Sequence, residues 1–195
     1  EVTAIPVDAS QLLRACAQNL QGYAEEFGSK ILFNDQAPHA VVNLDPDRLQ
    51  QVIANLLSNA VKFSPVGGKV ILSATLVGEQ VEIAVQDQGP GISPEFAQKI
   101  FQRFSQADAS SAKMKGGTGL GLALCKELVE AMQGTIGFHS KPDALADSPF
   151  QPRVWCNGWK NGVVQIWHWE KCYSYVFPQI LQGKPFPIFL SHPIW

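Results

Sequence analysis

The feature that most constrains the fold is a pair of segments in which apolar and polar residues alternate. A tight turn joins the two segments, and they come directly after a long amphipathic helix. Residues 69–77 and 80–88 are rich in Val and Ile and alternate apolar with polar side chains around a Gly-Glu turn. Residues 46–63 place apolar side chains on one broad face at helical spacing, and Asp45-Pro46 is a good helix start. The pattern predicts a hairpin within a sheet that is covered by helices.

The rest of the chain alternates helical and strand-like patterns irregularly. Ser10 is a plausible N-cap for the first helix. We expect further helices over residues 10–27, 94–104 and 120–132, and further strands over residues 31–33, 40–43 and 134–140. This order predicts an α/β sandwich, with a mixed sheet covered on one face by helices, and not a doubly wound parallel sheet.

Composition narrows the class of protein. The length of 195 residues suggests one domain, or one domain with an appendage, and 46% hydrophobic residues can supply a core. The net charge of −2 argues against a general nucleic-acid binder. The four cysteines form no C-x-x-C pair, which fits reduced thiols better than disulfides or a zinc site. With no apolar run of about 18 residues, we expect a cytoplasmic chain without membrane contact.

The composition changes near residue 145, where we place a domain boundary. All five tryptophans lie beyond it. We therefore expect a folded domain over residues 1–144 and an atypical Trp- and Pro-rich tail of unknown role over residues 145–195. Residues 163–177 alternate in strand fashion. Three explanations of the tail stay open: an altered reading frame or fusion without a selected function, a strand or hairpin that completes the sheet, and an aromatic docking surface for a partner.

A polar line runs along the helix predicted at 46–63. Asn55, Asn59 and Lys62 are spaced i, i+4 and i+7, so their side chains stack on one side. A solvated face is one explanation of such a line. Asparagine is a mediocre helix former, however, and two amides with an ammonium supply oxygen ligands for a hard cation and donors for phosphate. The line is therefore also a candidate binding site.

Two glycine-containing loops carry further chemistry. In "DQGPGI", Asp87 follows a strand and could accept a hydrogen bond from an exocyclic amine, although an ordinary turn is an equal alternative. "GGTGLGLAL", residues 116–124, lacks the Lys-Ser/Thr ending of a P-loop and the partners of a dinucleotide fingerprint. The remaining interpretation is a glycine loop that leads into the amino terminus of a helix, with Lys113 and Lys115 upstream. Such an arrangement binds phosphate.

Four segments in one order, "NLLSNAVKFSP", "DQGPGI", "IFQRF" and "GGTGLGLAL", resemble the N, G1, F and G2 boxes of the ATP-binding domain of sensor histidine kinases, in the GHKL superfamily. The resemblance covers about residues 5–142. It implies a two-layer α/β (α+β) sandwich with a mixed, mostly antiparallel sheet, helices on one face and a glycine-rich ATP lid. It also implies ATP and Mg²⁺ as cofactors.

The resemblance assigns roles by position. Asn55 would ligate Mg²⁺, Asp87 would bind the adenine amino group, and Phe101 with Phe104 would anchor the lid. The implied ATP-binding residues are Asn55, Asn59, Lys62, Asp87, Gly89, Gly91, Ile92, Phe104, Gly117, Thr118, Gly119, Leu120 and Gly121.

The resemblance further implies a protein-histidine kinase domain without its own phosphoacceptor histidine. His39, His139, His168 and His192 all lack the expected helical context. Gln51 stands where hydrolysing relatives carry a glutamate base, so transfer to a partner's histidine is favoured over hydrolysis. The implied partners are a dimerisation domain and a response-regulator receiver domain, with this chain as a possible cytosolic part of a membrane-bound sensor. A nucleotide-binding module without kinase activity and a Ser/Thr protein kinase of the same fold are the alternatives.

Overall fold

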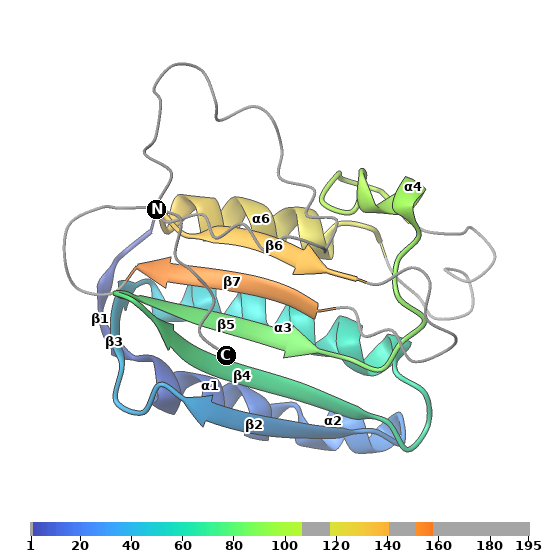
Figure 1. The fold of residues 1–195 in the computed structure, drawn as a ribbon, viewed down its shortest axis with the longest axis horizontal. Helices are drawn as coiled ribbons and strands as arrows, with labels where there is room; N and C mark the ends of the chain where they lie inside the picture. Colours follow the sequence, from blue (N-terminus) through green and yellow to red (C-terminus); the bar gives the residue numbers. More distant parts are fainter. Residues whose placement is uncertain (1, 107–117, 141–150, 158–195) are drawn as a thin grey trace, which may run out of the picture.

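A five-stranded sheet with helices on one face forms the body of the molecule (Figure 1). The computed structural model describes residues 2–106, 118–140 and 151–157. The strands lie in the order β2 (Lys30–Gln36), β4 (Lys69–Val77), β5 (Gln80–Gln86), β7 (Gln151–Asn157) and β6 (Thr135–His139). β2 and β4 are parallel and the other three pairs are antiparallel. The predicted mixed, mostly antiparallel sheet is confirmed.

The helical layer consists mainly of α1 (Ala9–Asn19), α3 (Pro46–Phe63) and α6 (Gly121–Ala131), which run along the same face of the sheet (Figure 1). α3 lies between the other two and packs on both of them. The short helices α2 (Gln21–Glu26) and α4 (Pro94–Ala97) are connecting elements. β1 (Ile5–Asp8) and β3 (Val41–Leu44) form a separate antiparallel pair.

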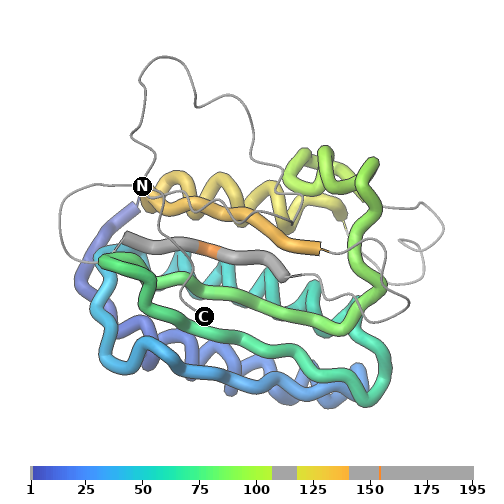
Figure 2. The backbone as a smooth tube through the Cα atoms, in the orientation of Figure 1, coloured from blue at the N-terminus to red at the C-terminus, as the bar shows by residue number. Residues whose placement is uncertain are grey.

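The hairpin and the long helix, which were the strongest sequence patterns, form the core. Leu72 faces Val85, and Ala74 faces Ile83, across β4 and β5, and all four side chains are buried. α3 adds seven buried residues to the same core: Leu49, Val52, Ile53, Leu56, Leu57, Ala60 and Val61. Figure 2 follows the backbone from α3 into β4 and back through β5. The sheet therefore fixes one side of α3 and leaves its polar line for other contacts.

The first predicted helix differs from the structure in two ways. It is two helices, α1 and α2, with a break at Leu20. Its N-cap is Asp8, whose Oδ1 accepts from the backbone N–H of Gln11, and not Ser10. Ser10 is buried, and its hydroxyl oxygen lies 3.0 Å from both Asp35 Oδ1 and the carbonyl oxygen of Ala37, so these two acceptors share its one proton. A carboxylate at the preceding turn takes the capping role because the hydroxyl is already used in tying α1 to β2.

The predicted helix at 94–104 is also too long. Only α4 is helical, and Ser93 caps it by accepting from the N–H of Phe96. The chain then turns, and Phe104 adopts a φ of 63°, which an α-helix cannot contain.

No strand was predicted at residues 151–157 in particular, but β7 agrees with one of the three open explanations of the tail, a strand that completes the sheet. Its backbone pairs with β5 on one side and with β6 on the other, and Val154 is fully buried between them. The boundary near residue 145 stays a prediction, although this strand beyond it belongs to the main sheet. The alternating pattern at 163–177 lies outside the described residues.

Candidate functional site

The polar line of α3 is held in a fixed position by a strong helix start. Asp45 Oδ1 accepts from the N–H groups of Asp47 and Arg48, each at 3.1 Å, and Oδ2 accepts from Thr3 N at 3.0 Å. These hydrogen bonds lower the pKa of Asp45, with the bond from Thr3 as the largest cause. The predicted Asn55, Asn59 and Lys62 follow along the helix and are all half-buried.

The amino end of α6 meets this line. A Cβ atom built on Gly121 would lie 3.5 Å from Asn55 Oδ1 and 3.8 Å from Asn59 Nδ2. Both the end of α3 and the start of α6 lie at the right of Figure 1. No side chain caps α6 at Leu120, within the described residues. The first N–H groups of α6 therefore stand beside two amide side chains, an arrangement suited to an anion with a hard cation.

The turn after β5 forms the second part of the site. Asp87 is 2% exposed, and its Oδ1 accepts from Gly89 N at 2.8 Å. A Cβ on Gly89 would lie 3.0 Å from both Asp87 Oδ1 and the carbonyl oxygen of Phe63. Only glycine fits here without displacing backbone, so the turn lies directly against the carboxyl end of α3.

The rest of the "DQGPGI" turn is anchored to β6. Gly91 has a φ of 75°, which favours glycine. Ile92 donates its N–H to Ser140 Oγ at 2.9 Å. The predicted Asp87, Gly89, Gly91 and Ile92 thus form one turn between α3 and the end of β6.

Phe104 and the glycine loop are joined directly. Phe104 N donates to the Gly119 carbonyl at 2.9 Å, and a Cβ on Gly119 would lie 2.9 Å from the Phe104 carbonyl carbon and from Ser105 O. The Phe104 side chain is 74% exposed. Arg103 adds an ion pair to Glu127 of α6, with 2.7 Å between Nη2 and Oε1.

The remaining predicted residues divide between described and undescribed positions. Thr118 and Leu120 are described and exposed. Gly117, with Lys113 and Lys115, lies outside the described residues. Phe101 packs edge-on against Phe138 of β6 at 6.0 Å between ring centroids, so it tethers this segment to the sheet.

Two residues that border the site were missed in the sequence. Phe63 ends α3 with 47% of its side chain exposed, and its carbonyl contacts Gly89. Cys125 is fully buried, and its thiol donates to Val52 O at 3.7 Å. Burial raises the pKa of the Cys125 thiol to about 12. Its spacing of four residues from Gly121 was the signal available, since both then face α3.

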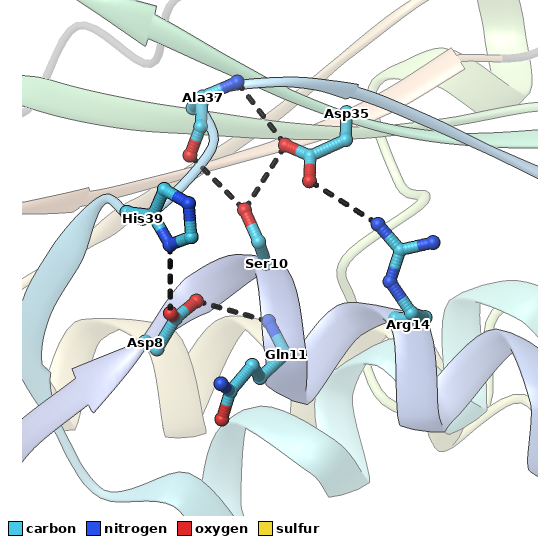
Figure 3. Close-up of polar contacts among 7 residues, drawn as sticks. All are labelled: Asp8, Ser10, Gln11, Arg14, Asp35, Ala37 and His39. Carbon is cyan, nitrogen blue, oxygen red and sulfur yellow. Dashed lines mark hydrogen bonds and ion pairs between the residues drawn. The ribbon is translucent and has the colours of Figure 1, made fainter.

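Neither described histidine is one of these residues, although His139 directly precedes Ser140, the partner of Ile92. His39 is in the loop before β3, with 94% of its side chain exposed and Nδ1 3.9 Å from Asp8 Oδ2 (Figure 3). His139 ends β6. A hollow of about 430 Å³ lies beside His39 and is lined by residues 36–41, Leu76, Glu79 and Val81. We take the residues around Asn55 and Asp87 as the candidate functional site instead, because polar groups and close-fitting glycines converge there.

The chain matches known proteins over this region. The family model for the histidine kinase-, DNA gyrase B- and HSP90-like ATPases matches residues 44–153. The sensor histidine kinase TmoS of Ectopseudomonas mendocina is 38% identical over 136 residues, which cover 69% of this chain and 14% of TmoS. The signal transduction histidine-protein kinase BarA of Escherichia coli K12 is 47% identical over 105 residues, which cover 51% of this chain and 11% of BarA.

A solved histidine kinase structure is also similar to this chain in fold. The crystal structure of full-length ShkA in complex with AMPPNP superposes with a TM-score of 0.68 and 31% identity, over 81% of this chain and 32% of ShkA. The chain therefore corresponds to a small part of each of these proteins.

Among the described residues, no helix is both long and apolar enough to span a membrane.

Proposed function

The chain belongs to the histidine kinase-, DNA gyrase B- and HSP90-like ATPase family, as a catalytic ATP-binding domain of the sensor histidine kinase type, and we propose that it donates the γ-phosphoryl group of Mg²⁺-ATP to a histidine on a separate dimerisation domain. The observation that carries this proposal is the meeting of the Asn55–Asn59 amides with the uncapped amino end of α6 at Gly121. Anion-binding N–H groups and oxygen ligands for a cation are combined there.

The side-chain oxygen atoms available here fit a magnesium ion that is coordinated jointly by the protein and by phosphate. In the described ranges, no group of three His, Cys, Asp or Glu side chains could form a protein cage for a metal. Magnesium bound with a nucleotide needs only one or two protein oxygens and fills its other positions with water and phosphate. Asn55 Oδ1 faces Gly121 and is the candidate ligand, and the ion would neutralise charge on the phosphates.

The other parts of the nucleotide have matching groups. The N–H groups of the first turn of α6, with Lys62 and Asn59, would hold the phosphates. Asp87, buried in the turn after β5, would accept a hydrogen bond from the adenine amino group. Gly89 leaves room for the base, and the exposed part of Phe63 offers it an apolar surface.

Transfer is favoured over hydrolysis because no base is placed for water on α3. Gln51, one turn before Asn55, is exposed, and its Oε1 accepts from Arg48 Nη1 at 3.5 Å. An amide cannot take a proton from water, whereas phosphoryl transfer depends mainly on positioning and charge stabilisation. The partner would be a dimerisation domain with the acceptor histidine, and a response-regulator receiver domain would take the phosphoryl group afterwards.

Phosphoryl transfer in trans tests this proposal. The chain, incubated with labelled ATP, Mg²⁺ and the phosphoacceptor domain of its own kinase, should label that domain with an acid-labile phosphoryl group. Omission of the acceptor domain should leave no labelled histidine in this chain. A folded chain that binds ATP but transfers nothing would establish a nucleotide-binding module instead, and an acid-stable product would indicate a Ser/Thr kinase.

A further inference from the structure

We infer that Ser140 is a positioning residue for the base of the nucleotide: its hydroxyl oxygen holds the far end of the turn after β5, so that this turn keeps its place when adenine binds. This inference rests on the proposed function, because it concerns the part of the site assigned there to adenine. It adds a role for a residue that lies directly after β6 and acts through the turn.

The topology of the sheet brings Ser140 within reach of this turn. β5 and β6 are both antiparallel to β7, which lies between them, so they run in the same direction and end at the same edge of the sheet (Figure 1). Neighbouring strands lie about 4.8 Å apart, so the turn after β5 must cross roughly 10 Å to reach the end of β6. The hydrogen bond from Ile92 N to Ser140 Oγ, at 2.9 Å, closes this distance.

The turn is supported at two points. Near its start, a Cβ on Gly89 would lie 3.0 Å from the carbonyl oxygen of Phe63, so the turn lies against the carboxyl end of α3. At its far end, Ile92 is held by Ser140. Gly91 lies between these points with a φ of 75°, and glycine leaves such a conformation for others at little cost. Loss of the second support should therefore let the turn move relative to α3.

The hydroxyl of Ser140 supplies an acceptor that an alanine side chain lacks. Ile92 and Ser140 are both half-buried, so water replaces a lost acceptor incompletely, and the unpaired N–H favours a displaced turn. The rings of Phe101 and Phe138, 6.0 Å apart, also tie the segment that follows the turn to β6. Removal of the hydroxyl should therefore shift the turn without detaching this segment from the sheet.

The consequence should be confined to the base end of the site. The turn carries Asp87, the proposed acceptor for the adenine amino group, and Gly89, which leaves room for the base. The phosphates would be held by the amides of α3 and the amino end of α6 at Gly121. A shifted turn should therefore weaken the binding of ATP and leave the binding of inorganic tripolyphosphate unchanged, because tripolyphosphate has no base.

Two measurements on the whole chain test this role. The first is calorimetric titration with Mg²⁺-ATP and with Mg²⁺-tripolyphosphate. We expect Ser140→Ala to lower ATP affinity about tenfold and to leave tripolyphosphate affinity unchanged. Ser140→Thr should restore ATP affinity, because threonine keeps the hydroxyl acceptor. Ser73→Ala is the matched control: Ser73 is a half-buried serine of β4 whose hydroxyl donates to Ala84 O at 3.5 Å, and its loss should change neither affinity.

The second measurement needs neither metal nor nucleotide. Hydrogen exchange of the Ile92 backbone amide, assigned by comparison with an Ile92→Val chain, reports directly on the bond to Ser140. Exchange should be slow in wild type and in Ser140→Thr, because the amide proton is held in a hydrogen bond. It should become about tenfold faster in Ser140→Ala and stay slow in Ser73→Ala.

The outcomes separate the two proposals. If wild type binds ATP and Ser140→Ala binds it equally well, or loses affinity for ATP and tripolyphosphate alike, the positioning role is overturned. If wild type binds no ATP, the proposed function fails, and the exchange of the Ile92 amide still decides whether Ser140 holds the turn. Should Ser140→Ala not fold, Ser140→Val takes its place in both measurements, because valine has the shape of threonine without the acceptor.

Discussion

At the scale of single residues, the junction between Phe104 and Gly119 leaves little room for change. Both residues have positive φ angles, 63° and 69°, and a Cβ on Gly119 would approach backbone atoms of Phe104 and Ser105 at 2.9 Å. Backbone cannot move aside as a flexible side chain can. A side chain at this position must therefore displace the start of the loop that leads into α6.

Replacement of Gly119 by alanine should for this reason weaken nucleotide binding. The left-handed conformation costs a non-glycine residue roughly 1–2 kcal/mol, and 1.4 kcal/mol corresponds to a factor of ten in affinity. We expect the dissociation constant for ATP, measured by calorimetry, to rise about tenfold in Gly119→Ala.

Gly22→Ala is the matched control, since a Cβ there meets nothing within 4 Å and the residue lies in α2. It should leave ATP affinity unchanged and raise the free energy of unfolding by up to about 1 kcal/mol. Wild-type ATP affinity in Gly119→Ala would show that the Phe104–Gly119 contact does not shape the site.

Spacing within one helix made part of the candidate site predictable. Asn55, Asn59 and Lys62 share a side of α3 because the helix period is fixed, and this needs no tertiary information. Cys125 could not be assigned in the same way, since its contact with Val52 depends on how α6 packs on α3. Ser10 was misassigned for a similar reason: its partners Asp35 and Ala37 lie far along the chain.

At the scale of elements, β7 is the critical piece of the sheet. It is the only neighbour of β6 within the described sheet and also covers one side of β5. Its loss would leave two unpaired strand edges and would remove Val154 from the core. The integrity of the sheet, and with it the Ile92–Ser140 anchor of the turn after β5, depends on this strand.

A comparison of two shortened chains tests the role of β7. Residues 1–157 should unfold cooperatively on heating and bind ATP, because every described element is retained. Residues 1–150 should lose the cooperative transition or aggregate through the exposed strand edges. Circular dichroism melting curves decide between these outcomes, and equal melting temperatures for the two chains would show that β7 contributes no stability.

The elements differed in how well the sequence predicted them. α3 was predicted with its correct ends because Asp45 and Pro46 mark its start and an unbroken apolar face follows. β1 has only four residues, including a proline, and β7, "QPRVWCN", also carries one. Such short segments become strands through the partners that tertiary structure supplies, so local patterns do not identify them.

At the scale of the whole molecule, the sheet and the helical layer bring three distant segments to one end. The polar line of α3, the turn after β5 and the amino end of α6 meet there, joined by the contacts of Gly89 with Phe63 and of Gly121 with Asn55. The order of helices and strands predicted the two layers. The position of the strand that separates β5 from β6 did not follow from it, because that strand comes last in the described chain.

Calorimetric titration of the full chain with AMPPNP and Mg²⁺ tests the central claim most directly. We predict one saturable site, with affinity lowered about tenfold or more in Asp87→Asn, since an amide presents a donor where the adenine amino group needs an acceptor. Asp8→Asn is the control, because asparagine also caps a helix and Asp8 lies at the His39 corner (Figure 3). A folded chain without saturable binding, or with equal affinity in Asp87→Asn, would contradict the assignment of this site.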